Sequence, residues 1–338
     1  MLRIHFTGRD VETLRIADRP DPLWEIVCSL CRLQDRWGRI AFEQWRRETV
    51  GRLLPGEAVW HAVRGLYDLV PGRSTYFPDF LTPPVVPGLN GLHAGIDRVL
   101  STPRDRLHTE IGLLTTSTKT VPAAAGQLAR GDTAALKRLG DDLLTYHDTF
   151  VAPLWPRIET AVAMDVARRT RALVTGGTRG LLETFRPVIT WRSPVLWADY
   201  PVDRDMYLEG RGLLLVPSYF CWRRPITVVD QDLQPVLVYP VDKLLVPAAG
   251  TGPAAPASGL AKLLGPTRAA LLHETAARDC VSTSALAGLA LVSLPSVSQQ
   301  LAILRDAGLV ASRRDGKYVR HSVTPLGRRL LGTDTGTR

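Results

Sequence analysis

The segment from Ser282 to Thr324 limits the fold more strongly than any other part of the chain. Ser282-Thr-Ser284 is a cluster of capping residues in front of the apolar run 285–290, which indicates a short helix. After a short break, Ser293 can cap a second helix that has Pro295 in its first turn, where the missing N–H of proline costs nothing. The spacing of helix, tight turn and helix is that of a helix-turn-helix.

The second helix is expected to have two different faces. Its apolar side chains are assigned to the core: Leu294, Val297, Leu301, Ile303 and Leu304. The opposite face carries Ser296, Gln299 and Gln300, whose short or amide side chains can reach base edges and phosphates. Ser298, like Ser296, lies near the helix N-terminus, which attracts phosphate. Any short helical hairpin could show the apolar pattern, so that pattern alone does not decide between core packing and DNA binding.

A β-hairpin is predicted directly after this helix, which ends at Gly308. Residues 309–314 and 317–324 flank Asp315-Gly316, a dipeptide that favours a two-residue hairpin turn. Two adjoining arginines on a strand are often only a solvated edge. In this order, however, the helices and the basic hairpin predict a winged helix-turn-helix that binds duplex DNA. The hairpin is its wing, and these cations surround the tip: Arg313, Arg314, Lys317 and Arg320.

The charge distribution agrees with a DNA-binding module in the C-terminal part. The net charge is +9, and residues 260–332 hold ten Lys or Arg against four Asp or Glu, so +6 of it falls there. A small basic unit beside a nearly neutral larger one is typical of a module that binds a polyanion, although a solvated basic face would look the same. Arginine outnumbers lysine by 37 to 5, which we interpret as the codon bias of a bacterium with high G+C content.

Three stretches of this region resemble winged helix repressors of the ArsR type: Gly265–Leu272, Ser293–Val310 and Arg313–Val319. The resemblance covers about 260–331 of the chain. It implies a homodimer that binds a partly palindromic operator in double-stranded DNA, with the second helix of the motif in the major groove. It also implies a transcriptional repressor, although repression or activation is set by the position of the operator, which the chain does not encode.

The sequence departs from this family at three places. The family's serine-glutamine-histidine run is Ser298-Gln299-Gln300 here, so a polar contact remains without its pH sensitivity. The turn, often glycine, holds Leu291, which shifts the turn if a positive φ is needed there. Metal-sensing members carry Cys-x-Cys in the first helix of the motif, where this chain has Ala285-Leu286-Ala287. We therefore expect a regulator that does not sense metals and needs no cofactor.

The clearest boundary in the chain is 247–259, a Pro-, Ala- and Gly-rich stretch without charge, which we interpret as a linker. It separates the domain expected to bind an effector and to dimerise, 1–246, from the winged helix-turn-helix, 260–332. Helical spacing marks a long helix through Leu23, Ile26, Val27, Leu30, Leu33, Trp37 and Ile40, and further helices near 90–100, 104–118, 133–147 and 156–174.

From about residue 188 the chain changes to β-rich runs: 212–216, 226–229 and 236–239. The predicted fold class is α+β, mainly α, with a helical N-terminal domain closed by a small β-sheet. Three N-terminal pieces also resemble the uncharacterised domain that precedes such modules in some bacterial regulators: Asp21–Trp24, Pro187–Trp191 and Glu209–Ser218.

Two patterns suggest chemistry that their context argues against. Cys28 and Cys31 form a Cys-x-x-Cys inside an amphipathic helix, but zinc needs four ligands and Cys221 and Cys280 are isolated in the sequence, so we interpret the pair as buried apolar thiols. Ala172–Leu181 resembles the dinucleotide loop of short-chain dehydrogenases, and Tyr239 with Lys243 mimics their Tyr-x-x-x-Lys. That loop should follow a strand, not a long helix, and Pro240 after Tyr239 excludes a shared helix face.

The sequence thus favours a regulator over an enzyme. Two alternatives stay open: a winged helix that binds protein, and a nucleotide-dependent oxidoreductase. No apolar stretch approaches the length of a membrane span, and the first residues lack the apolar core of a signal peptide, so we expect a cytoplasmic location without membrane contact. A small-molecule effector is expected in the N-terminal domain, but no cluster of polar residues identifies it.

Overall fold

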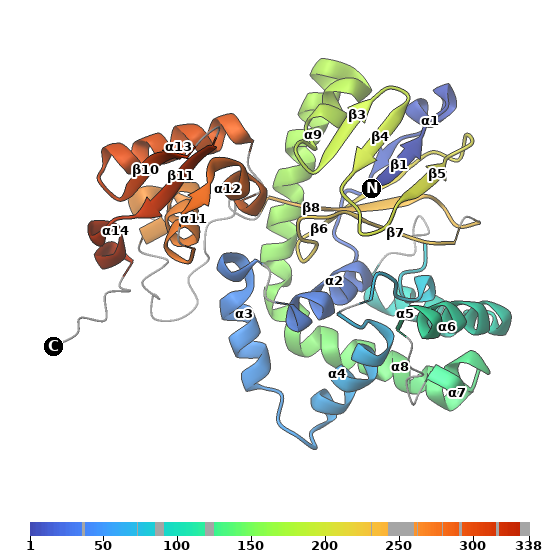
Figure 1. Ribbon diagram of the computed structural model, residues 1–338. Helices are drawn as coiled ribbons and strands as arrows, with labels where there is room; N and C mark the ends of the chain where they lie inside the picture. The colour runs from blue at the N-terminus through green and yellow to red at the C-terminus, as the bar shows by residue number, and fades with distance from the viewer. Residues whose placement is uncertain are drawn as a thin grey trace. The chain divides into compact units, whose positions relative to one another are not determined.

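The chain forms two compact units, shown in the computed structural model of Figure 1. The structure describes residues 1–35, 38–72, 74–84, 91–118, 125–230, 232–242, 260–261, 263–278, 280–290, 293–315 and 318–331. Unit 1 comprises Met1–Thr184 and Ile189–Val241, and unit 2 comprises Phe185–Val188 with Asp242–Arg338. The expected linker 247–259 lies outside the described residues, so the expected domain boundaries stay predictions.

Unit 1 is mainly helical, as the sequence predicts. Its helices are α1 (Gly8–Glu12), α2 (Pro22–Gln34), α3 (Arg39–Gly51), α4 (Ala58–Leu69), α5 (Leu92–Leu100), α6 (Arg104–Thr118), α7 (Ala125–Ala129), α8 (Thr133–Tyr146) and α9 (Trp155–Glu183). Short turns η1 (Asp79–Leu81), η2 (His147–Val151) and η3 (Ala152–Leu154) connect some of them. The four helices expected between residues 90 and 174 are α5, α6, α8 and α9, although α9 continues to Glu183 across the non-helical Gly177.

The long helix expected from Leu23 to Ile40 is wrong, because the chain forms two helices there. Asp21 begins α2 by accepting hydrogen bonds from two backbone N–H groups, and α2 ends at Gln34. Gly38 then has φ +66, and a Cβ there would lie 2.8 Å from the ring of Phe42. Since both helices bury one apolar face, periodicity runs across the break and hides it.

The strands of unit 1 form two four-stranded sheets instead of the one that the sequence predicts. The first has the order β3 (Ile189–Arg192), β4 (Val195–Ala198), β1 (Leu2–His5), β5 (Arg204–Tyr207). The second has the order β2 (Arg15–Ile16), β6 (Leu214–Ser218), β8 (Val236–Pro240), β7 (Ile226–Thr227). The strands β1 and β2 come from the first 16 residues, so the N-terminus completes both sheets.

Buried carboxylates connect the helices of unit 1 to its sheets. Glu25 in α2 is fully buried and accepts hydrogen bonds from the N–H groups of Tyr219 and Phe220, at 2.6 and 2.9 Å, and from the hydroxyl of Ser218. These residues end β6 or directly follow it. A buried backbone N–H without a partner is costly, so this carboxylate stabilises the end of the strand.

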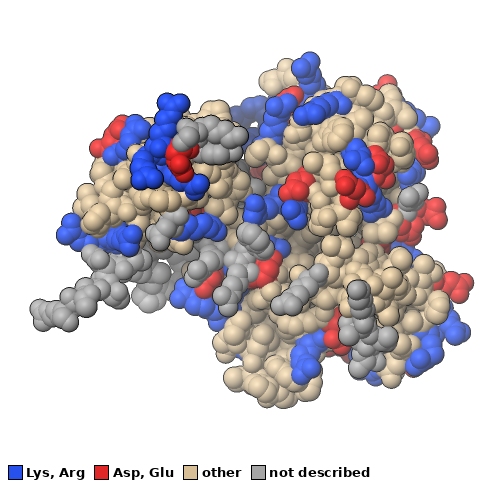
Figure 2. Space-filling view, in the orientation of Figure 1, with Lys and Arg blue, Asp and Glu red and all other residues tan. Residues whose placement is uncertain are grey.

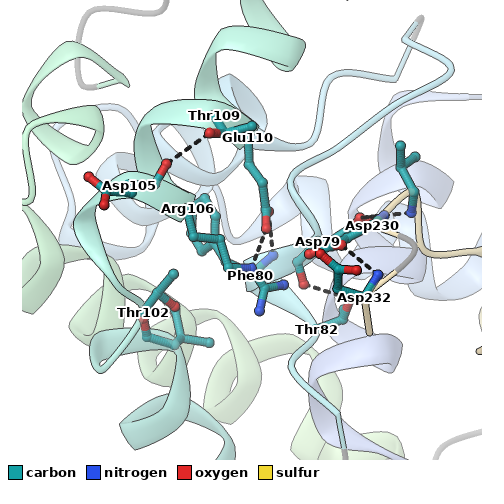
Figure 3. A network of polar contacts seen from close by, with 12 residues as sticks. Asp79, Phe80, Thr82, Thr102, Asp105, Arg106, Thr109, Glu110, Asp230 and Asp232 are labelled. Atoms are coloured by element: carbon teal, nitrogen blue, oxygen red, sulfur yellow. Dashed lines mark hydrogen bonds and ion pairs between the residues drawn. The ribbon is translucent and has the colours of Figure 1, made fainter. Parts of the chain in front are cut away.

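Asp79 plays the same part at a second place (Figure 3). Its carboxylate accepts hydrogen bonds of 2.7 Å from the N–H groups of Val229 and Asp230, while Glu110 in α6 accepts one from the N–H of Phe80. Burial raises the pKa of Asp79 to about 6, and the hydrogen bonds from the two N–H groups only partly oppose this.

Unit 2 is a small α+β domain with a three-stranded sheet. Its elements are α11 (Pro266–Ala276), β9 (Val281–Ser282), α12 (Thr283–Ala290), α13 (Leu294–Asp306), β10 (Val310–Asp315), β11 (Tyr318–Val323) and α14 (Pro325–Leu330), and the sheet order is β10-β11-β9. Residues 260–261 and 263–264 are also helical, so the expected interruption at Gly265-Pro266 is present. The core is formed by side chains from the helices α11, α12 and α13 and from the three strands.

In the part of the chain that the structure describes, no single helix is long and apolar enough to cross a membrane. Only when taken together do the two helices of one bent pair, Thr283–Leu289 and Leu294–Asp306, reach the length and apolar composition of a membrane span. The buried side chains of this pair, such as Leu286 and Val297, pack in the core of unit 2.

Candidate nucleic-acid interface

The helices α12 and α13 form the bent pair that the sequence predicts, with 110° between them. The hydroxyl of Ser282 accepts a hydrogen bond from the N–H of Ala285, so the expected cap of α12 is present. Ser293 is the residue before α13 and its backbone is extended, but its hydroxyl makes no capping hydrogen bond. Ser293 therefore marks the helix start by its backbone alone. Leu291, in the turn, lies outside the described residues.

The outer face of α13 carries the polar residues that the sequence assigns to it. Ser298 and Gln299 are exposed, whereas Ser296 and Gln300 are half-buried. Between them, Val297, Leu301 and Leu304 are buried in the core of unit 2. The polar side chains of α13 thus point away from the apolar residues that hold the helix in place.

Two residues of α13 contradict the sequence prediction. Leu294 and Ile303 are expected in the core, but 50% and 41% of their surface is exposed. Leu294 occupies the first position of the helix, beyond the end of the core, and Ile303 lies about 100° around the helix from its neighbour Leu304. A count of apolar residues cannot separate these positions from the core.

The wing is a regular antiparallel hairpin, although its turn differs from the prediction by one residue. Asp315 pairs with Tyr318, so the residues between the strands are Gly316 and Lys317 instead of Asp315 and Gly316. Lys317, one of the cations predicted to contact DNA, lies outside the described residues. Asp315 is the last residue of β10, and its carboxylate pairs with Arg320 across the hairpin.

The wing arginines differ in how free their charges are. Arg320 contacts the carboxylate of Asp315 at 2.6 Å and donates a hydrogen bond to the backbone oxygen of Cys280. Arg313 and Arg314 are exposed, and neither has an ion-pair partner among the residues that the structure describes. Figure 2 shows Lys and Arg side chains gathered over unit 2. Arg313 lies directly across from Arg320, whereas Arg314 faces Val319 on the other side of the hairpin. The wing therefore presents a cation on each of its two faces.

A buried histidine that sequence reasoning missed connects the wing to α12. His321 is 5% exposed, and its two ring nitrogens lie 2.8 Å from the hydroxyls of Thr283 and Ser312. Burial, with the charge of Arg305, lowers the pKa of His321. The neutral ring thus fixes the base of the wing against the start of α12. The available signal was that His321 lies two residues before Val323, and so on the same face of the strand as an apolar residue.

The two patterns that mimic other chemistry sit in the core or in helices. The thiol of Cys28 hydrogen-bonds with that of Cys221, which together with burial raises its pKa, and burial raises the pKa of Cys31 to about 11. Such thiols are poor nucleophiles. Cys221, isolated in the sequence, is thus next to Cys28 in space. No group of three or more metal-ligating side chains forms a site among the residues that are described.

The dinucleotide-like stretch Ala172–Leu181 lies inside α9 and does not follow a strand. Tyr239 belongs to β8, is buried, and donates a hydrogen bond to the carboxylate of Asp165 in α9. Lys243 lies outside the described residues. A pyrophosphate loop needs a strand before it and a free backbone, so this stretch lacks the required geometry.

Comparison with known families agrees with the C-terminal assignment. Residues 263–313 match a family described as a helix-turn-helix domain. Residues 123–244 match a family of unknown function, DUF5937, and this range contains two of the three N-terminal pieces noted above. No curated protein and no solved structure matches the chain. The C-terminal part is thus a helix-turn-helix domain of the kind that DNA-binding transcription regulators carry, as the sequence predicts.

Proposed function

We propose that the protein is a sequence-specific transcriptional repressor of the ArsR type that binds duplex DNA through unit 2 and does not sense metals. In this proposal α13 enters the major groove and the wing lies against the phosphates. One observation carries it: the exposed Gln299 of α13 and the exposed wing cations Arg313 and Arg314 occur in one small unit. The protein would act in the bacterial cytoplasm and not as an enzyme.

Homodimerisation is part of the proposal, since two copies are needed to read a partly palindromic operator. The last described helix, α14, has only six residues and offers little surface for a stable dimer. We infer that unit 1 supplies the interface. A fragment that begins at Ser258 should then bind an operator more weakly than the full chain, because it loses the avidity of two sites. Equal affinity and equal oligomeric state of the two would exclude this arrangement.

An effector is also proposed for unit 1, without an identified ligand. A cavity of about 80 Å³ lies between β5 and the segment 228–235, lined by charged and apolar residues that include Arg204, Arg211, Glu209 and Leu233. Pockets for drug-sized ligands are several times larger. This cavity would hold only a few heavy atoms, so it does not define an effector class.

The second candidate function is a winged helix that binds another protein. The exposed Leu294 and Ile303 on α13 favour it, because apolar surface is typical of protein contacts. The exposed wing arginines Arg313 and Arg314 favour DNA, since a protein-binding module has no need of a basic wing.

The test is the binding of the full chain to a fluorescent duplex of random sequence, followed at increasing salt. We expect binding whose affinity falls linearly with salt on logarithmic axes, as counterions leave the phosphates. Heparin should compete for the same site. A protein that binds neither DNA nor heparin at about 50 mM salt would contradict the proposed function.

A further inference from the structure

The outward face of α13 is uncharged along most of its length. Opposite the buried Val297, Leu301 and Leu304, this face carries Pro295, Gln299, Ala302 and Ile303, and it ends at Asp306. The first charged side chain of the helix is Arg305, in the last turn. In the proposed complex the wing contacts the phosphates. Up to Ile303, α13 then presents one amide and several apolar side chains to the groove.

The chemistry of base edges gives this composition a meaning. Guanine is read mainly by Arg or Lys, cytosine by Asp or Glu, adenine by Gln or Asn, and thymine by apolar contact with its C5 methyl group. From Pro295 to Ile303, the outward face of α13 holds only the last two kinds of side chain, and the charged Arg305 and Asp306 follow in its last turn. The part of the face up to Ile303 therefore lacks the groups that would distinguish a G·C pair by charge-assisted hydrogen bonds.

We propose that α13 reads A·T base pairs, with Gln299 bound to adenine and Ile303 in contact with a thymine methyl group. This assignment rests on the proposed function. Gln299 and Ile303 are four residues apart on one face, about 6 Å along the helix axis. Successive bases of one strand are about 3.4 Å apart, so the two side chains reach base pairs one or two steps apart. Ile303 is not buried in the core of unit 2. Its exposed apolar surface would leave the solvent when it covers the methyl group.

The first experiment selects DNA from a random pool with the full chain and with Gln299→Ala. Positions whose base preference disappears in the variant mark the bases beneath α13. We expect A·T at these positions. Preference for G·C there would overturn the inference but leave the proposed function standing, whereas failure to select any sequence would remove both.

The second experiment replaces thymine by uracil, one marked position at a time, in the selected DNA. Uracil keeps the hydrogen bonds of thymine and lacks only the methyl group. Removal of one contacted methyl should weaken binding of the full chain about three- to fivefold at one position. In Ile303→Ala this loss should shrink to less than about 1.5-fold, because the partner of the methyl is gone.

Leu330→Ala is the matched control, since Leu330 is also a half-exposed apolar residue but lies on α14, and 39% of its surface is exposed. This variant should keep the full sensitivity to uracil. An unchanged affinity of the full chain for every uracil-substituted DNA would overturn the inference. So would an Ile303→Ala variant that is as sensitive to uracil as the full chain.

Discussion

The two units differ in where their charged side chains lie. In unit 1, carboxylates such as Glu25, Asp79 and Asp165 are buried and bound to backbone N–H groups or to an arginine. In unit 2, the only buried polar side chains among the described residues are Thr275 and His321, and Arg313 and Arg314 are exposed. Unit 1 therefore uses buried charges to hold its own fold, whereas unit 2 exposes the wing charges of Arg313 and Arg314 at its surface.

The largest effect should come from removing a buried carboxylate in unit 1. Glu25→Ala leaves the N–H groups of Tyr219 and Phe220 without their acceptor, which should lower the free energy of unfolding by about 3–5 kcal/mol. All eight tryptophans lie at or before Trp222, so denaturant unfolding followed by tryptophan fluorescence reports on unit 1. Exposed Glu48→Ala is the control and should stay within about 0.5 kcal/mol. A loss below about 1 kcal/mol for Glu25→Ala would break the comparison.

A smaller effect is expected from the charge of Asp79, and it depends on pH. The pKa of Asp79 is about 6 in the fold against 3.8 for a free carboxyl, so the fold binds its proton more tightly. The stabilisation is present at low pH and is lost as the pH rises through 6. Asp79→Asn stays neutral and keeps an oxygen acceptor. The free energy of unfolding of Asp79→Asn minus that of the native chain should therefore rise by roughly 2 kcal/mol between pH 4.5 and pH 7. A difference that is constant or falls with pH would show that Asp79 is not held in this way.

In unit 2, the ion pair with Asp315 should make the charge of Arg320 less available to DNA phosphates than the charge of Arg313. Arg320→Ala should weaken binding to random DNA by well under 1 kcal/mol, and this loss should be smaller than that for Arg313→Ala. Asp315→Asn frees Arg320 and should strengthen binding by about two- to fivefold at low salt. Equal losses for the two arginine variants, with no gain for Asp315→Asn, would mean that DNA breaks the pair on binding.

The smallest expected effect is that of metals. Arsenite, zinc and cadmium should leave operator affinity unchanged, since α12 has Ala285-Leu286-Ala287 where metal-sensing repressors of the ArsR type have thiols. The high pKa of the Cys28 thiol also disfavours metal binding in unit 1. A release of DNA by tenfold or more on adding a metal, abolished by Cys280→Ser, would contradict this.

The sequence predicted unit 2 better than unit 1, because its signals are local. The order of α12, α13 and the wing follows from caps, turn residues and periodicity within about 40 residues. The errors are of one residue or one side chain, such as the turn at Gly316 and the exposure of Ile303. Whether an apolar residue is core or surface near a helix end depends on where neighbouring elements stop, which periodicity does not record.

Unit 1 depends on pairings between residues far apart in the chain. β1 lies between β4 and β5, some 200 residues later, and Glu25 binds the backbone near Tyr219. No local pattern in the first 25 residues shows these partners. A buried glutamate inside an amphipathic helix is indistinguishable, in one sequence, from a solvated one.

The central claim is that α13 reads sequence while the wing supplies charge, and one paired measurement tests it most directly. Affinities of Gln299→Ala and Arg314→Ala are measured for the selected operator and for random DNA at several salt concentrations. Gln299→Ala should weaken the operator by about 1–3 kcal/mol and spare random DNA, whereas Arg314→Ala should weaken both and reduce the salt slope by about one. Equal losses on both DNAs for Gln299→Ala, or an unchanged slope for Arg314→Ala, would contradict this division.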